Sequence, residues 1–251
     1  MLITDAEIIW LKEYYPGLRF IKRNSGIIAG NLHFDMFYDE ANAKYIINPD
    51  SDCHPPSMRI RDSYQIEITF QNSEQDLPIV KETGRRIETV AQANNLSMLD
   101  FHINNDGSAC LCFIFDKYTY LPNGFNIRDF MHNLLVPFFY AQSFYERDHR
   151  WPWGEYEHGL FALFQWYAER KEAITIDGLN QCIDYIKRCK NIKGYKVPTL
   201  ILTLLKQKDN IKGHQPCVCG SNIKFRNCHP RIFNGLWKMK KDYESINNNY
   251  Q

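Results

Sequence analysis

Residues 64–70 read Tyr-Gln-Ile-Glu-Ile-Thr-Phe (YQIEITF), and this stretch gives the clearest indication of the fold. Its apolar and polar side chains alternate, which is the period of a half-buried β-strand. Residues 32–38 show the same alternation, and residues 18–23 and 26–30 supply another pair of strands. The pattern predicts an antiparallel, four-stranded meander with one apolar face.

Helical signals lie on both sides of these strands. Thr4, with Glu7 three residues later, forms a capping-box pattern, and Pro16-Gly17 ends the helix that it begins. Residues 126–146 are apolar at helical spacing, with a kink or break expected at Pro137. Residues 71–125 are rich in loop signals. Further helices are expected at residues 160–172, 177–190 and 232–246, with a short segment at 198–208 between the last two. Helices kept apart from an antiparallel sheet define the α+β class.

The composition indicates a globular protein. Of 251 residues, 44% are hydrophobic and 14% aromatic, so a core can form and we expect a folded rather than a disordered chain. No run approaches the ~20 apolar residues of a membrane span. The first residues are acidic and lack the basic segment of a secretory signal. We therefore expect a cytoplasmic protein with no membrane partner.

The charge is distributed unevenly along the chain. Residues 1–180 carry 16 Lys and Arg against 25 Asp and Glu, a net charge of −9. Residues 181–251 carry 14 against 4, a net charge of +10. Two interpretations are open. The basic end binds an acidic partner such as nucleic acid, or the two charged parts solvate the protein or contact each other.

Residues 101–113 (FHINNDGSACLCF) place two thiols just after a polar turn. Such a position suits a reactive cysteine, whose thiolate can carry an acyl group as a thioester. The alternative is a half-buried structural cysteine, because free cysteine is among the most buried residue types. Cys112 is interpreted first as a packing residue on the same strand face as Cys110.

The stretch resembles the signature of the ubiquitin-conjugating enzyme family. His102-Ile103-Asn104 stands where the family has His-Pro-Asn, and Cys110-Leu111 follows the histidine at the family's eight-residue interval. The resemblance implies that Cys110 carries the thioester and that Asn104 stabilises the oxyanion or holds the loop in shape. It also implies that His102 is a structural hydrogen-bonding residue and that Asp106 orients or deprotonates the incoming amine.

Two further stretches are similar to a bacterial branch of conjugating-enzyme-like proteins from antiphage (CBASS-type) systems. They are residues 77–87, which begin Leu-Pro, and residues 151–159 (WPWGEYEHG). The resemblance implies a cargo, either a cGAS-like nucleotidyltransferase or a ubiquitin-like protein, and an acceptor protein amine. The chain has no Gly-rich phosphate loop of an activating domain.

A second cluster of metal-binding residue types lies near the C-terminus. Cys217, Cys219, Cys228 and His229 are four ligands within 13 residues, the complement of a closed, structural Zn²⁺ site. Residues 214–230 resemble the SEC-C motif, a small zinc module. A metal would supply folding energy to a segment with so little apolar area.

Together these patterns predict three parts: a conjugating domain at 1–172, a helical linker at 173–210, and a zinc module with a helical tail at 211–251. The function they favour is a cysteine-dependent acyl transferase in antiphage defence. Two alternatives are open. One is a catalytically silent adaptor of the same fold, and the other is a nucleic-acid-binding protein that acts through the basic zinc module.

Overall fold

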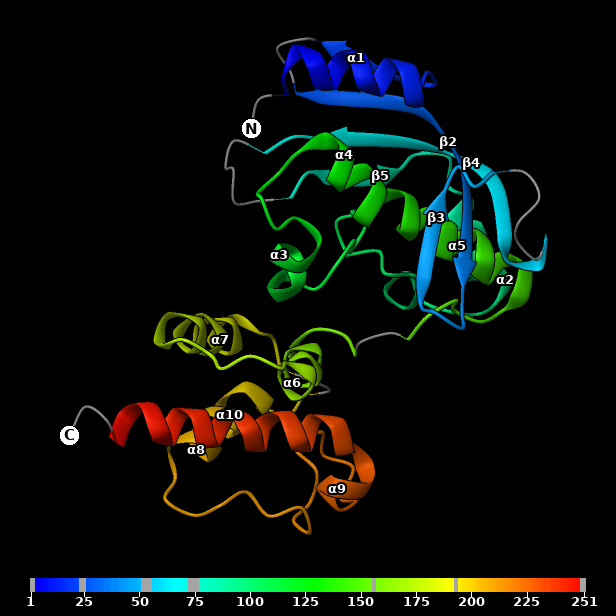
Figure 1. Cartoon of the computed structure of the whole chain (residues 1–251). Helices are drawn as coiled ribbons and strands as arrows, with labels where there is room; N and C mark the ends of the chain where they lie inside the picture. Colours follow the sequence, from blue (N-terminus) through cyan, green and yellow to red (C-terminus); the bar gives the residue numbers. More distant parts are fainter. Residues whose placement is uncertain are drawn as a thin grey trace. The chain divides into compact units, whose positions relative to one another are not determined.

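The computed structural model describes residues 3–22, 26–50, 56–71, 77–154, 157–191 and 194–248 (Figure 1). The chain divides into two compact units, Met1–Glu155 and Tyr156–Gln251. The first contains the sheet, and the described part of the second contains helices but no strand. The fold is therefore mixed, with an antiparallel sheet and helices, as predicted.

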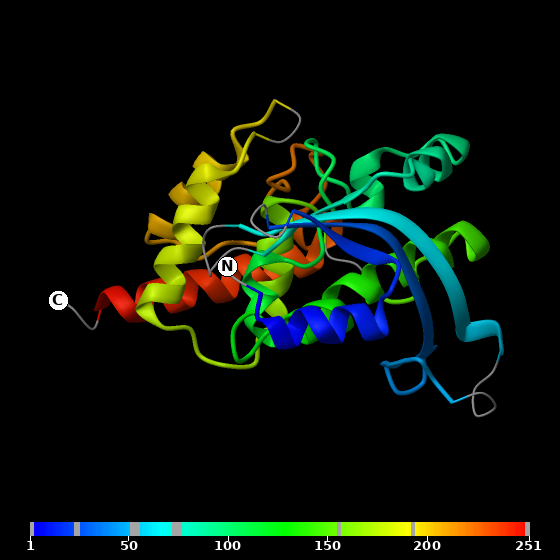
Figure 2. The same ribbon diagram turned by 90° about the horizontal axis from the view of Figure 1, so that it is seen from above.

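The sheet has five strands rather than the four predicted. They are β1 (Leu18–Lys22), β2 (Ile27–Asp39), β3 (Lys44–Ile47), β4 (Arg59–Thr69) and β5 (Ile79–Glu82). The order is β1-β2-β4-β5, every pairing is antiparallel, and β3 pairs with the end of β2. The predicted stretches 26–30 and 32–38 belong to one long strand, β2, which runs beside β4 in both views (Figures 1 and 2).

The period-two pattern places the apolar side chains on one face, as expected. Leu32 lies opposite Tyr64 and Ile28 lies opposite Ile68, and all four are buried. This face packs against α5 (Val136–Asp148), and both belong to one continuous hydrophobic core.

The helices predicted near the start and near the end of the first unit are both present. In α1 (Asp5–Tyr14), the Thr4 side chain accepts from the Glu7 N–H and the Glu7 carboxylate accepts from the Thr4 N–H. Residues 126–146 form α4 (Ile127–Phe130), a π-helical turn (Met131–Leu135) and α5. The π turn directly precedes Pro137, which lacks the N–H that a regular helix would use.

The segment 71–125 contains more regular structure than its loop signals indicate. It holds β5, α2 (Arg86–Ala93), α3 (Lys117–Tyr120) and two 3₁₀ turns, Met98–Phe101 and Ile114–Asp116. The candidate thiol loop lies between the two 3₁₀ turns.

The second unit begins earlier than the predicted boundary at residue 172. Its helices are α6 (Leu160–Glu169), α7 (Ile176–Arg188), α8 (Val197–Lys206), α9 (Phe225–Cys228) and α10 (Pro230–Asn248). Because α6 packs along α10 and α7 packs on α8, the predicted conjugating-domain end, linker and zinc module form a single unit. The helices α6 and α10 approach most closely at Gly235, where a Cβ atom would lie 1.7 Å from the carbonyl oxygen of Phe164.

Candidate functional site: the thiol loop and the metal cluster

A hydrogen-bonded turn at residues 104–108 precedes the two thiols. The Asn104 N–H donates to the Ser108 carbonyl (2.8 Å), and the Gly107 N–H donates to the Asn104 carbonyl (2.9 Å). Gly107 has φ +80°, which glycine adopts without steric cost. The turn is therefore fixed by its own backbone.

The side chain of Ser108 ties the polar residues of this turn together. Its hydroxyl donates to the Asp106 carboxylate (2.6 Å) and accepts from the Asn104 amide (3.1 Å). Ser108 is buried, whereas Asn104 and Asp106 are exposed. The sequence analysis did not select Ser108, although Asp-x-Ser is a pattern in which an aspartate bonds the backbone two residues on. Here the Asp106 carboxylate accepts from the Ser108 N–H at 3.0 Å.

Backbone hydrogen bonds then hold the chain at Ala109 and Cys110. The Ala109 N–H donates to the carbonyl of Val80 in β5 (2.8 Å), and the Cys110 N–H donates to the carbonyl of His102 (2.7 Å). Cys110 itself is exposed. Its Sγ lies 4.0 Å from the carbonyl oxygen of Cys112, at the outer limit of a weak S–H···O contact. The loop thus holds an exposed cysteine residue on a fixed backbone.

Neither thiol is activated by a lowered pKa. Although Cys110 is exposed as a residue, the protein atoms around its sulfur desolvate it and raise the pKa of the thiol. Burial raises the pKa of Cys112 to about 12, and the neighbouring Cys110 and Asp116 add to the shift. Residues 110–112 are also not part of a strand, so the predicted shared strand face is wrong. Cys112 remains a half-buried, protonated thiol at neutral pH.

His102 supports the loop around Cys110 through its backbone carbonyl. It has φ +56° and its carbonyl accepts from Cys110, while its ring lies edge-on to Trp151 at 5.3 Å. Trp151 also contacts the rings of Phe101 and Tyr145. This packing holds the histidine in place and fits the predicted structural role.

The surroundings of Asp106 and Asn104 favour some of their predicted roles over others. The hydrogen bonds from Ser108 lower the pKa of Asp106, so its carboxylate is a weak base at neutral pH and better suited to orienting an amine. The amide of Asn104 is engaged in holding the turn, with one N–H donated to Ser108. Its second N–H leaves a donor for a developing oxyanion.

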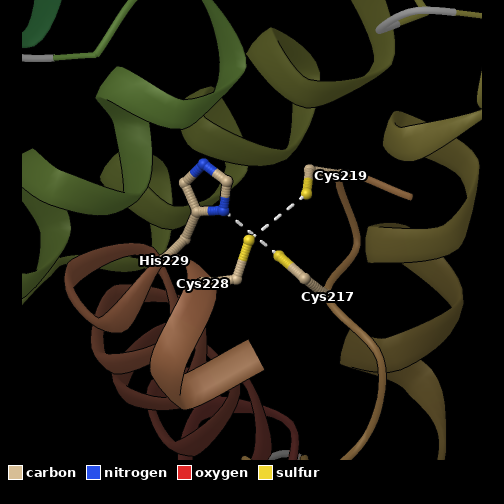
Figure 3. A group of neighbouring side chains, drawn as sticks. All are labelled: Cys217, Cys219, Cys228 and His229. Atoms are coloured by element: carbon tan, nitrogen blue, oxygen red, sulfur yellow. Dashed lines mark hydrogen bonds between the residues drawn. The ribbon is translucent and has the colours of Figure 1, made fainter. Parts of the chain in front are cut away.

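The second site brings together all four predicted metal ligands. The candidate donor atoms of Cys217, Cys219, Cys228 and His229 lie within 4.8 Å of one another, and their side chains converge (Figure 3). The Cys217 Sγ lies 3.2 Å from His229 Nδ1, and the Cys219 Sγ lies 3.6 Å from the Cys228 Sγ. The group can therefore hold a metal ion.

Two aromatic residues support this metal cluster. The ring of Phe161 in α6 lies 5.1 Å from the ring of His229. Gly220, with φ +83°, turns the chain after Cys219, and a Cβ there would lie 2.4 Å from the Tyr195 ring. The Ser221 hydroxyl lies 3.0 Å from the Cys228 Sγ. The ligands are thus fixed by packing to α6 and to the segment before α8, as well as by their own short loop.

Other residues that the sequence singled out are packed in the structure or lie outside the described residues. Cys182 is buried in α7, and Trp153 packs on Tyr38 and Tyr140. Cys53 and Glu155 lie outside the described residues. None of the helices in the described ranges combines the length and apolar content that crossing a bilayer requires.

Comparison with protein-family models, with curated proteins and with solved structures gave no significant match to this chain. The geometry of the two sites therefore carries the functional argument.

Proposed function

We propose that the chain is a cysteine-dependent transferase of the ubiquitin-conjugating type, with Cys110 as the thiol that carries the cargo. The observation that supports the proposal most directly is an exposed cysteine on a backbone held by Val80 and His102. A large substrate such as a protein terminus needs this access. A fixed backbone limits the reorganisation needed to reach the reacting geometry.

The reaction has two acyl transfers. First, the Cys110 sulfur attacks the activated carbonyl of the cargo's C-terminal residue, supplied as an acyl adenylate or as a thioester on another protein. A new S–C bond forms, the donor's leaving group departs, and the thiol proton passes to a base. Second, an acceptor amine attacks the thioester carbonyl, an N–C bond forms, the amine loses a proton, and the cysteine leaves and regains one.

The residues around the thiol have distinct roles in this scheme. The free N–H of the Asn104 amide is the donor for the oxyanion, and the loss of such a donor typically costs ~3 kcal/mol of transition-state stabilisation. Asp106 orients the amine. The raised pKa of Cys110 keeps the resting thiol protonated, so a base must take its proton before the sulfur attacks the acyl donor.

The cargo implied by the sequence resemblance is a cGAS-like nucleotidyltransferase or a ubiquitin-like protein, within bacterial antiphage defence. The acceptor is a protein amine. We place the activating step on a separate protein.

The metal in the second unit is proposed to be a structural Zn²⁺. With metal–sulfur bonds of about 2.3 Å, a tetrahedral site has sulfur–sulfur edges of about 3.8 Å. The 3.6 Å separation of Cys219 and Cys228 fits that edge. Three thiolates and one imidazole fill the four positions, so the ion would contribute folding energy rather than catalysis.

The test is intact mass spectrometry of the full chain co-expressed with its candidate cargo and activating protein. Wild type and Cys112→Ala should each carry an adduct of the cargo's mass that hydroxylamine removes. Cys110→Ala should carry none and should form no conjugate. If Cys110→Ala still links cargo to amines at the parent rate, the transferase proposal fails. If Cys110→Ala retains cargo binding and the wild type never forms an adduct, the protein is the adaptor.

A further inference from the structure

Residues 210–241 contain seven lysine and arginine residues and no aspartate or glutamate. Two of the seven serve as caps inside the second unit. The Lys238 Nζ donates to the carbonyl of Arg170 at the end of α6, and the buried Lys240 donates to the carbonyls of Leu205 and Gln207 after α8. Lys240 also pairs with Glu244 at 2.9 Å. These two charges are therefore committed to the fold.

The other five charges are exposed, and among the described residues they form no ion pair. They are Lys212, Lys224, Arg226, Arg231 and Lys241. Four of them lie in residues 212–231, the segment that carries the metal ligands; in it the Arg226 N–H donates to the carbonyl of Gly213, and Lys224 pairs with Pro216 in an isolated β-bridge. The second unit thus carries exposed positive charges that no carboxylate among the described residues pairs with.

The charge continues onto the exposed face of α10. Arg231, Trp237 and Lys241 lie within one sector of the helix, opposite its buried apolar side chains. Trp237 is 39% exposed, and the Lys241 Nζ lies 3.8 Å from the centre of its ring. Beside the metal ligands, Tyr195 is 52% exposed and its ring packs on Gly220.

We propose that this basic surface, defined by Lys212, Lys224, Arg226, Arg231, Trp237 and Lys241, binds single-stranded nucleic acid. Unpaired Lys and Arg side chains contact phosphates, and exposed aromatic rings stack on bases, which is the combination that single strands require. An anionic membrane fits less well. Insertion would need a free apolar helix face, whereas Ile232, Leu236 and Met239 of α10 are buried. The inference is independent of Cys110.

The test uses fluorescence anisotropy of the metal-loaded full chain with a labelled oligo(dT) of about 20 nucleotides, longer than a typical single-strand site. If all five charges contact phosphates, log K should fall with log salt at a slope of about −3.5, at about −0.7 per contact. The variant Lys224→Gln/Arg226→Gln/Arg231→Gln should reduce the slope to about −1.4. The matched control, Lys12→Gln/Arg19→Gln/Lys44→Gln, removes three exposed charges from the first unit and should bind like the parent.

Trp237→Ala should weaken binding by about 5- to 150-fold, the loss expected for one stacked base, and Trp237→Phe should recover most of it. Metal content and far-UV circular dichroism must equal the parent's in each variant. The proposal is overturned if the control triple variant weakens binding as much as the Lys224 triple variant, or if Trp237→Ala binds unchanged. It is equally overturned if duplex is preferred, or if anionic vesicles or polyglutamate bind and the oligonucleotide does not.

Discussion

Replacing Gly235 by alanine should destabilise the second unit, although alanine is the better helix former. The added Cβ would lie 1.7 Å from the carbonyl oxygen of Phe164, 2.6 Å from its carbonyl carbon and 2.9 Å from its Cα. All three atoms are backbone, so no rotamer change relieves the contact, and α6 and α10 must move apart. Overpacking typically costs ~1–3 kcal/mol, and a backbone clash belongs at the upper end.

Helix propensity works in the opposite direction. Alanine gains ~1 kcal/mol over glycine in a helix interior. The difference leaves a net loss of about 2 kcal/mol in the free energy of unfolding, so packing outweighs propensity.

The same substitution should also weaken metal binding. Phe164 lies one turn from Phe161 on α6, and the Phe161 ring packs 5.1 Å from His229. A displaced α6 therefore removes support from a ligand. Loss of outer-shell support typically lowers metal affinity about 10- to 100-fold.

Urea denaturation followed by far-UV circular dichroism measures the first effect, and competition with a chromophoric zinc chelator measures the second. Asn234→Ala is the matched control, because it lies next to Gly235 on the exposed side of α10 and should gain a few tenths of a kcal/mol. A Gly235→Ala protein with an unfolding midpoint at or above the parent's would refute the packing argument. Unchanged metal affinity at reduced stability would refute the link through Phe161.

Three further predictions concern the thiol, the metal and the first helix. Since burial raises the pKa of Cys110, its rate of alkylation by iodoacetamide should go on rising above the usual thiol pKa of about 8.5, and a plateau below that pH would contradict this. Removing the metal with a chelator should abolish hydrogen-exchange protection at residues 211–230 while β2 and β4 stay protected, and retained protection there would exclude a structural metal. Glu7→Ala should cost about 1 kcal/mol of stability at pH 7 through loss of the capping box. Burial of Glu7 opposes ionisation, but the hydrogen bonds from Thr4 and Ile127 outweigh it and lower the pKa of the carboxyl. Its contribution is therefore fully present above the unfolded pKa of about 4.3 and is lost as pH falls through the folded value. The cost of Glu7→Ala should accordingly shrink at pH 3 in urea titrations, and an equal cost at both pH values would contradict it.

The elements that sequence reasoning found are those whose signals are local. The alternation in residues 64–70 and the Thr4–Glu7 capping box depend only on neighbours a few positions away, and both are present. By contrast, α2 (Arg86–Ala93) follows the N-cap residue Arg85, which has φ +60° and makes no capping hydrogen bond through its side chain. No start signal marks that helix in the sequence, and long-range contacts stabilise it: Ile87 is buried, and Arg86 pairs with Asp62 and Glu146.

The predicted boundary between the units lies too late for the same reason. The pattern at residues 160–172 correctly predicts a helix, which ends at Glu169, but it does not specify which surface covers the apolar side of α6. The decisive contact is the approach of Phe164 to Gly235, about 70 residues further along the chain. A glycine inside a helical pattern indicates close packing without naming the partner.

The two candidate sites also differ in whether they are built from one local segment or from distant segments. This difference decides which experiment each site needs. The metal ligands come from a single short segment, so their spacing alone predicts their convergence, and the structure places them together. The environment of Cys110 is assembled from β5 through Val80, from the turn through Ser108, and from Trp151 behind His102. A motif in one segment cannot specify the pKa that such an assembly produces, and the pKa of this thiol is raised rather than lowered. A reactive cysteine with a raised pKa must be identified by the adduct that it carries, because its reaction with small alkylating reagents at neutral pH will resemble that of a structural thiol.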